Sequence, residues 1–269
     1  MRILFDKMSK HIFLLLLLLI ATPARADITS GLVGWWKMDE AASGACSGAS
    51  VVDSSGQGNT GTCTGSPVWV AGKIGSGAMS FSGSNFVGTG VNLLEGKSMF
   101  SVAFWINVTS FPGPAYQTSA LSQYWTVFGP SNGYQGYTNT FSAAVASGSN
   151  LNAEGTSTTN GYSTGVWYHY VAVYDGTQTG NSNRLKLFIN ATQQVLVYDG
   201  PEPATSYVSG NMLRMASSQG TFFIPALIGI LDDVRVYNRA LSGAEVAELY
   251  QYNVSHFGGG HIGNGRLGR

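Results

Sequence analysis

Short segments rich in aromatic and β-branched residues recur along the chain, and turn-forming residues separate them. Such segments are typical of β-strands, because these side chains pack well on a pleated surface. Charged residues make up only 10% of the 269 residues while 36 are glycine, which favours many strands with tight turns over a helical bundle. We therefore predict one large all-β sandwich, with strands at residues 32–38, 78–81, 100–108, 167–174, 185–189, 194–198 and 228–237.

The first 26 residues have the pattern of a secretory signal peptide. Arg2, Lys7 and Lys10 precede an unbroken apolar run at 12–20, and small residues follow up to Ala26. The run is about half the roughly 20 residues that a transmembrane helix needs, so a retained anchor is the weaker alternative. We expect cleavage after Ala26, no stable membrane span after cleavage, and a secreted protein in an extracellular or periplasmic location.

The charge balance argues against nucleic acid as a partner. Four of the 14 Lys and Arg and one of the 14 Asp and Glu lie in residues 1–26, so the remainder has a net charge of −3. A nucleic-acid-binding domain needs a clustered basic face, and the sequence has no such cluster.

One segment near the C-terminus has the pattern of a helix. Ser242 and Glu245 have the spacing of a capping box, and Leu241 and Val246 occupy the positions of a hydrophobic staple. We predict a short helix at 242–251, the only substantial one of the mature chain. The glycine-containing end, residues 253–269, is predicted to be a flexible tail.

Cys46 and Cys63 are the only cysteines. In an exported chain an isolated pair this close in sequence is most simply a disulfide. The alternative is a metal site made from the two cysteines, but no nearby histidine completes it. Closing a loop of this size contributes about 3 kcal/mol in the chain-entropy model.

The order of the motifs resembles a known family. The run LDDVRVYNRALS at 231–242, followed by EVAELY at 245–250, is the strongest match, and further matches lie at 33–40, 53–61, 72–81, 100–106, 167–176 and 185–190. Together they resemble a laminin-G-like domain of the concanavalin A-like lectin/glucanase superfamily, of the bacterial secreted type. The resemblance covers residues 31–252 and implies a jelly-roll sandwich of two antiparallel sheets with one short C-terminal helix.

The resemblance also implies a calcium site. In related folds an aspartate on the last strand binds calcium together with the N-terminal region, and Asp232 occupies that position here. Calcium prefers six to eight oxygen ligands, and an oxygen-rich loop follows Asp53. The expected calcium ligands are Asp53 and Asp232, with contributions from Asn59 and Asp39.

The same residues have a structural alternative. Asp53 is equally suited to an Asx turn. Asp232 is followed by Arg235 and Arg239, and either arginine could be its ion-pair partner.

The sequence offers no catalytic motif. Glycosidases generally need two carboxylates beside the scissile bond, and the related glucanases carry Glu-x-Asp-x-x-Glu on one strand. No such run occurs here, nor a Gly-x-Ser-x-Gly or His-Glu-x-x-His motif. His169 lies among strand aromatics and is expected to be packed there. We therefore expect a protein that is not an enzyme.

Residues 109–165 are irregular and rich in aromatics, and loops on a rigid sandwich often bind ligands. Aromatic rings offer apolar faces to sugar C–H groups, whereas the alternative is that these rings fill the core. The candidate ligand-binding residues are Tyr124, Trp125, Tyr134 and Tyr137.

The leading hypothesis is a secreted, calcium-stabilised, non-catalytic module that recognises carbohydrate or another extracellular surface component. One alternative is a structural or adhesive surface protein that contacts other proteins. Another is a hydrolase or lyase built on the same sandwich, which lacks the expected carboxylate pair.

Overall fold

The computed structural model describes residues 26–48, 50–113, 116–124, 126–132, 134–146, 154–217 and 226–257. The predicted signal peptide, apart from Ala26, and the chain after Phe257 lie outside these residues. In the part that the structure describes, no helix is both long and apolar enough to cross a membrane.

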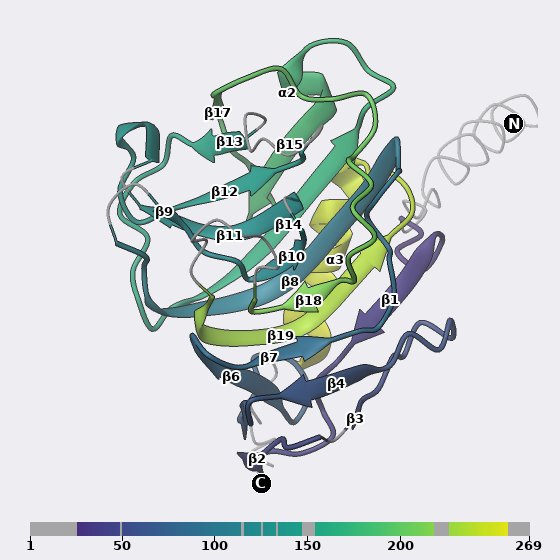
Figure 1. Cartoon of the computed structure of the whole chain (residues 1–269), viewed down its shortest axis with the longest axis vertical. Coiled ribbons are helices and arrows are strands. Elements are labelled where there is room, and N and C mark those ends of the chain that lie inside the picture. Colours follow the sequence, from purple (N-terminus) through teal and green to yellow (C-terminus); the bar gives the residue numbers. More distant parts are fainter. Residues whose placement is uncertain are drawn as a thin grey trace, which may run out of the picture.

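Two sheets of antiparallel strands form a sandwich (Figure 1). Sheet A has the strand order β16-β15-β14-β8-β19-β6-β5-β2, and β1 pairs with β19 beside this path. Its strands are β1 (Leu32–Trp36), β2 (Gly44–Ala45), β5 (Val68–Val70), β6 (Ala78–Ser82), β8 (Met99–Ser110), β14 (Trp167–Asp175), β15 (Leu185–Ile189), β16 (Thr192–Gln193) and β19 (Ile228–Tyr237).

Sheet B has the order β17-β13-β12-β11-β10-β18-β7-β4-β3, and β9 pairs with β11. Its strands are β3 (Ser50–Val51), β4 (Gly61–Thr64), β7 (Phe86–Gly88), β9 (Tyr116–Gln117), β10 (Leu121–Gln123), β11 (Thr126–Asn132), β12 (Thr140–Ala144), β13 (Glu154–Ser157), β17 (Leu196–Tyr198) and β18 (Arg214–Met215). The predicted jelly-roll sandwich of two antiparallel sheets is confirmed.

The core lies between the two sheets and is rich in aromatic rings. Phe104 of β8 stacks on Tyr170 of β14 with ring centroids 4.5 Å apart. Phe100 of β8 meets Phe128 of β11 edge to face at 6.1 Å, which joins sheet A to sheet B. All four rings are fully buried, so the long central strands of sheet A form one wall of a continuous core.

The predicted C-terminal helix is present as α3 (Gly243–Phe257) and covers the outer face of sheet A. Figure 1 shows it in yellow against the strands β8, β14 and β19. Val246 and Leu249 are buried there, and Tyr250 stacks on Trp105 of β8 at 5.8 Å. Because no glycine or proline interrupts the chain between 244 and 257, the helix continues past the predicted end at 251 into residues assigned to the tail. Two shorter helical segments are α2 (Asn181–Arg184) and η1 (Tyr134–Gly136).

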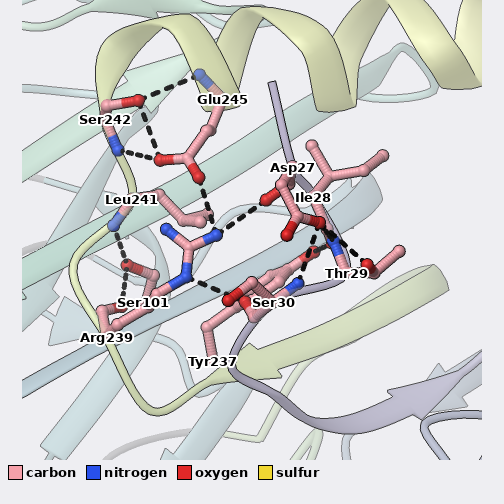
Figure 2. Close-up of polar contacts among 10 residues, drawn as sticks. All are labelled: Asp27, Ile28, Thr29, Ser30, Ser101, Tyr237, Arg239, Leu241, Ser242 and Glu245. Atoms are coloured by element: carbon pink, nitrogen blue, oxygen red, sulfur yellow. Dashed lines mark hydrogen bonds and ion pairs between the residues drawn. The ribbon is translucent and has the colours of Figure 1, made fainter. Parts of the chain in front are cut away.

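The start of α3 is fastened to the N-terminal segment by polar contacts (Figure 2). The predicted capping box forms: the Ser242 amide donates to Glu245 at 2.7 Å, and the Glu245 amide donates back to the Ser242 hydroxyl at 3.3 Å. Arg239 donates to the carbonyl oxygens of Ser30 and Asp27, both at 2.8 Å, and forms an ion pair with Glu245 at 2.7 Å. One arginine therefore links residues 27–30 to the last helix.

Cys46 and Cys63 form the predicted disulfide, with Cα atoms 5.8 Å apart. Cys63 lies on β4 of sheet B, and Cys46 directly follows β2 of sheet A. Both are buried, so the bond crosses the core at one edge of the sandwich.

Candidate functional site

Asp53 fastens its loop to strand β1. Its Oδ1 accepts hydrogen bonds from the amides of Trp35 and Ser55, both at 2.9 Å, and its Oδ2 accepts from the Ser55 hydroxyl and the Asn59 amide, both at 2.8 Å. Burial alone would raise the pKa of Asp53, but these hydrogen bonds outweigh it and hold the pKa below its ordinary value. The hydrogen bond from the Ser55 amide to Asp53 Oδ1 forms an Asx turn, which was one of the two roles predicted for Asp53.

Asn59 completes this loop. Its side-chain amide donates to the Val33 carbonyl at 2.7 Å, and its own carbonyl accepts from the Trp36 indole at 2.8 Å. Asp53 and Asn59 together therefore hold the oxygen-rich loop against the first strand of sheet A.

Asp232 has a buried carboxylate oxygen without a partner. Its Oδ2 accepts from the amides of Lys73 at 2.7 Å and Ile74 at 2.8 Å, whereas Oδ1 has no hydrogen-bond partner in the described residues. Burial raises its pKa to about 8, and the negative charges of Asp233 and Asp39 add to the effect. A side chain in this position gains from a cation at Oδ1.

Neither of the two arginines that could have paired with Asp232 does so. Arg235 forms its ion pair with Asp233 at 3.0 Å, and Arg239 forms its ion pair with Glu245. The predicted alternative for Asp232 therefore fails.

Asp39 contacts the same turn, residues 73–77, whose amides hold Asp232. Its Oδ1 accepts from the amides of Ser76 at 2.6 Å and Gly77 at 3.0 Å. Backbone oxygens crowd around this turn: a Cβ added at Gly77 would lie 2.4 Å from the Ala41 carbonyl oxygen and 2.5 Å from that of Met38. The turn therefore brings carbonyl oxygens and two carboxylates into one small region.

The four predicted calcium ligands divide into two pairs: Asp53 with Asn59, and Asp39 with Asp232. Among the described residues, no three His, Cys, Asp or Glu side chains lie close enough to hold a metal ion by themselves. Calcium also accepts backbone carbonyls as ligands, so the region of Asp39 and Asp232 fits this ion if carbonyls supply the remaining oxygens. Asp232 Oδ1 is the oxygen whose unpartnered state argues most directly for a cation.

The predicted aromatic site is only partly within the described residues. Tyr124 is half-buried with a left-handed φ of 55°, and its ring lies 6.1 Å from that of Tyr207. Tyr137 is also half-buried. Trp125 and the side chain of Tyr134 lie outside the described part of the chain. A platform built from these four residues stays a prediction.

The outer face of sheet B contains a hollow of about 550 Å³ that the sequence reasoning missed. Strands β4 and β7 and the segment leading into β18 line it. Thr62, Gly88 and Arg214 form one cross-strand row across these strands. Gly88 has no side chain, so the middle of the row is open. We call this feature the Gly88 hollow.

Phe86 and Arg214 form one side of the Gly88 hollow. The Phe86 ring lies next to Gly88, where an added Cβ would be 3.5 Å from a ring carbon. The Arg214 guanidinium lies over the same ring, 4.4 Å from its centroid. Thr62 and Thr64 are exposed on β4 opposite them, which gives the hollow hydroxyl groups, a ring and one positive charge.

A period-two pattern could have identified part of this hollow. Thr60, Thr62 and Thr64 alternate with Gly61 and Cys63, and the structure exposes the threonines while burying the other two. The segment is short and contains glycine, so it does not have the aromatic and β-branched composition by which strands were predicted.

A family model described as "Concanavalin A-like lectin/glucanases superfamily" matches residues 81–247, more than half of the chain. The chain belongs to this superfamily. The match lies within the predicted domain at 31–252 and includes the end of β6, the strands β7 to β19 and the start of α3. A search of the curated proteins found no match to this chain.

Solved structures share the fold of this superfamily domain at low sequence identity. One is domain 4 of AbnA, an extracellular arabinanase from Geobacillus stearothermophilus, in complex with arabinotriose: it is 19% identical, with a TM-score of 0.59, over 82% of this chain and 98% of that one. Another is the binding domain of Paraclostridial Mosquitocidal Protein 1, at 13% identity and a TM-score of 0.57, over 83% and 52%. A third is the botulinum neurotoxin serotype D binding domain, at 13% and 0.53, over 85% and 53%. The chain spans about half the length of the last two, and at these identities the likeness shows the fold.

Proposed function

We propose that this domain is a secreted, non-catalytic module that binds carbohydrate in the Gly88 hollow. The observation that carries the proposal is the hollow itself, in which threonine hydroxyls face an aromatic ring and a guanidinium on adjacent strands. Small-molecule sites are concave, of about 300–1,000 Å³, with apolar surface and a few placed polar groups. The hollow has this size and composition.

The position of the hollow favours binding without large rearrangement. The paired strands β4, β7 and β18 supply Thr62, Thr64, Phe86, Gly88 and Arg214, and the rest of the lining comes from the segments next to these strands. Cys63, Val87 and Met215 anchor the three strands in the core from the opposite face. Side chains on packed strands keep their orientation better than side chains on loops. The part of the hollow that the strands supply is therefore in place before a ligand arrives.

The lining of the hollow supports binding rather than hydrolysis. It contains no aspartate or glutamate among the described residues. Glycosidases generally need two carboxylates on either side of the scissile bond. A sugar bound here would therefore meet hydroxyls and a guanidinium but no acid–base pair.

The structural likeness to a sugar-binding domain also supports the proposal. The similar domain of the arabinanase was solved with arabinotriose bound. Function depends on the site rather than on the fold. The proposal of a sugar ligand therefore rests on the residues of the hollow, and the ligand of the arabinanase domain is not transferred to this chain.

Calcium is proposed as the stabilising ion, held by Asp232 and Asp39 with backbone carbonyls of residues near them. It would supply the positive charge that offsets the buried carboxylate of Asp232. Because Asp232 lies on β19 and its amide partners lie in the turn before β6, an ion there would join the last strand to the N-terminal part of the sandwich.

A glycan array tests the proposed function, with wild type compared with Gly88→Val. The φ of Gly88 is not in the left-handed region, and a Cβ there would be in ordinary van der Waals contact with the Phe86 ring, so a β-branched residue fits the strand while filling the hollow. Val68→Thr, an exposed position on β5 of sheet A, serves as the control. We expect wild type and the control to bind and Gly88→Val to lose binding with an unchanged Tm. Glycan binding that survives Gly88→Val would contradict the proposal.

A further inference from the structure

Arg214 differs from the other arginines of the described chain. Arg184 donates to the carbonyls of Gln178 and Glu202, and Arg235 and Arg239 form ion pairs. The Arg214 guanidinium makes no hydrogen bond or ion pair with any described residue, and it lies over the ring of Phe86, 4.4 Å from the centroid. An arginine has five N–H donors that normally find acceptors, so this one is available to a ligand.

The contact with Phe86 fixes where the guanidinium lies. Cation–π attraction and stacking hold a guanidinium over an aromatic face and leave its N–H edge free. Arg214 is paired in register with Gly88, and the missing side chain there leaves space beside the guanidinium. The free donors therefore line the Gly88 hollow, in an orientation set before binding.

The side chains that line the hollow carry a positive charge. No carboxylate lines it in the described residues, and Arg214 is its one charged side chain. Glu95 lies behind the adjoining turn, where it accepts from the Gly210 amide and the Asn92 side chain, both at 2.8 Å, and from the Ser209 hydroxyl. These donors hold Glu95 within the turn and leave Arg214 unpaired.

We propose that the Gly88 hollow selects acidic carbohydrate, namely a sugar unit with a carboxylate such as a uronic acid. The carboxylate would accept two N–H bonds from Arg214, and Thr62 and Thr64 would meet the sugar hydroxyls. A planar carboxylate with one charge matches a single guanidinium fork. This inference rests on the proposed function and specifies the ligand class of the same site.

Titration calorimetry with matched oligosaccharides tests the inference. The probes are oligogalacturonate and oligoglucuronate, the methyl-esterified oligogalacturonate that has the same size without the charge, and a sulfated neutral oligosaccharide. We expect wild type to bind an acidic probe roughly tenfold or more tighter than the ester. Arg214→Gln should lose that advantage, and Arg214→Lys should recover only part of it, because lysine keeps the charge without the fork.

The controls separate the two proposals. Lys186→Gln on β15 of sheet A removes one positive charge away from the hollow and should leave binding unchanged. If neutral sugars bind in a way that Gly88→Val blocks and Arg214→Gln does not alter, the acidic preference is wrong and the proposed function stands. If wild type prefers the sulfated probe to both uronates, the inferred selectivity for a carboxylate is also wrong. If Gly88→Val blocks no probe, both proposals fail.

Discussion

Arg239 and Glu245 form an ion pair of 2.7 Å at the point where the last strand of the sandwich leads into helix α3. The same guanidinium donates to the carbonyl oxygens of Asp27 and Ser30, and the same carboxylate caps the helix through Ser242. Figure 2 shows these contacts converging on one arginine. The N-terminal segment and the C-terminal helix are therefore held by a shared network, although the sequence separates them by more than 200 residues.

Replacing Arg239 should loosen both ends together. Arg239→Ala removes the ion pair and the donors to two carbonyls, so we expect a loss of about 1–2 kcal/mol in the free energy of unfolding, measured in urea. Glu245→Gln keeps an oxygen for the cap and loses only the charge, so its loss should be smaller. Equal stability of Arg239→Ala and wild type would show that the network is not stabilising.

Breaking the disulfide should destabilise the edge of the sandwich that contains β2 and β4. A double Cys46→Ala, Cys63→Ala variant loses a cross-link that closes a loop with a sequence separation of 17. We expect a decrease of about 3 kcal/mol in the free energy of unfolding, and a corresponding decrease in the Tm of wild type in reducing agent. An unchanged Tm on reduction, with thiol labelling confirming the reaction, would contradict this.

Asp232→Asn should have opposite effects with and without calcium. The pKa of Asp232 is raised from 3.8 to about 8, so the folded state holds the proton more tightly than the unfolded chain. The stability from this proton is complete below about pH 4 and is lost as the pH rises through about 8. In chelator at pH 8 the uncharged asparagine should therefore melt at a higher temperature than wild type.

With calcium the order should reverse. Calcium at one hundred times its Kd would stabilise wild type by about 2.7 kcal/mol, and Asp232→Asn should lose most of this response. Asp53→Asn is the matched control, because Asp53 already accepts four hydrogen bonds from the protein. If calcium raises the Tm of wild type and Asp232→Asn equally, Asp232 is not a ligand. A loss of response in Asp53→Asn alone would place the site at the other pair.

Glu202 should weaken the fold at alkaline pH. Both of its carboxylate oxygens are buried without a hydrogen-bond partner in the described residues. Burial, with the nearby charges of Asp199 and Glu154, raises its pKa from 4.5 to about 9. The stability from its proton is complete below about pH 4.5 and is lost as the pH rises through about 9.

Glu202→Gln cannot ionise, so its Tm should fall less than that of wild type between pH 5 and pH 9. Thermal melts in chelator measure this, and Glu40→Gln, at an exposed position, is the control. Parallel Tm curves for wild type and Glu202→Gln would show that the burial of Glu202 has no cost.

The strands that the sequence predicted are mostly those of sheet A. All seven predicted segments are strands, and only the one that became β17 lies in sheet B. The central strand β8 is buried along most of its length because the core covers one face and α3 the other, so its sequence is almost continuously apolar. Sheet B strands such as β4 and β13 are short and consist of Gly, Ser, Thr, Cys and Glu, and local composition does not separate these from turns.

The sequence by itself determined the family, the all-β class, the capped helix and the disulfide, because each depends on residue types at short or fixed spacing. Tertiary structure decided the site. Thr62, Gly88 and Arg214 lie far apart in the chain and meet only through the register of β4, β7 and β18. The fold also places Asp53 apart from Asp39 and Asp232. The Asp53 carboxylate binds the amide of Asn59, whereas the carboxylates of Asp232 and Asp39 bind the amides of Lys73 and Ser76. Contacts between distant strands are set by the global packing of two sheets, and no local pattern in the chain specifies them.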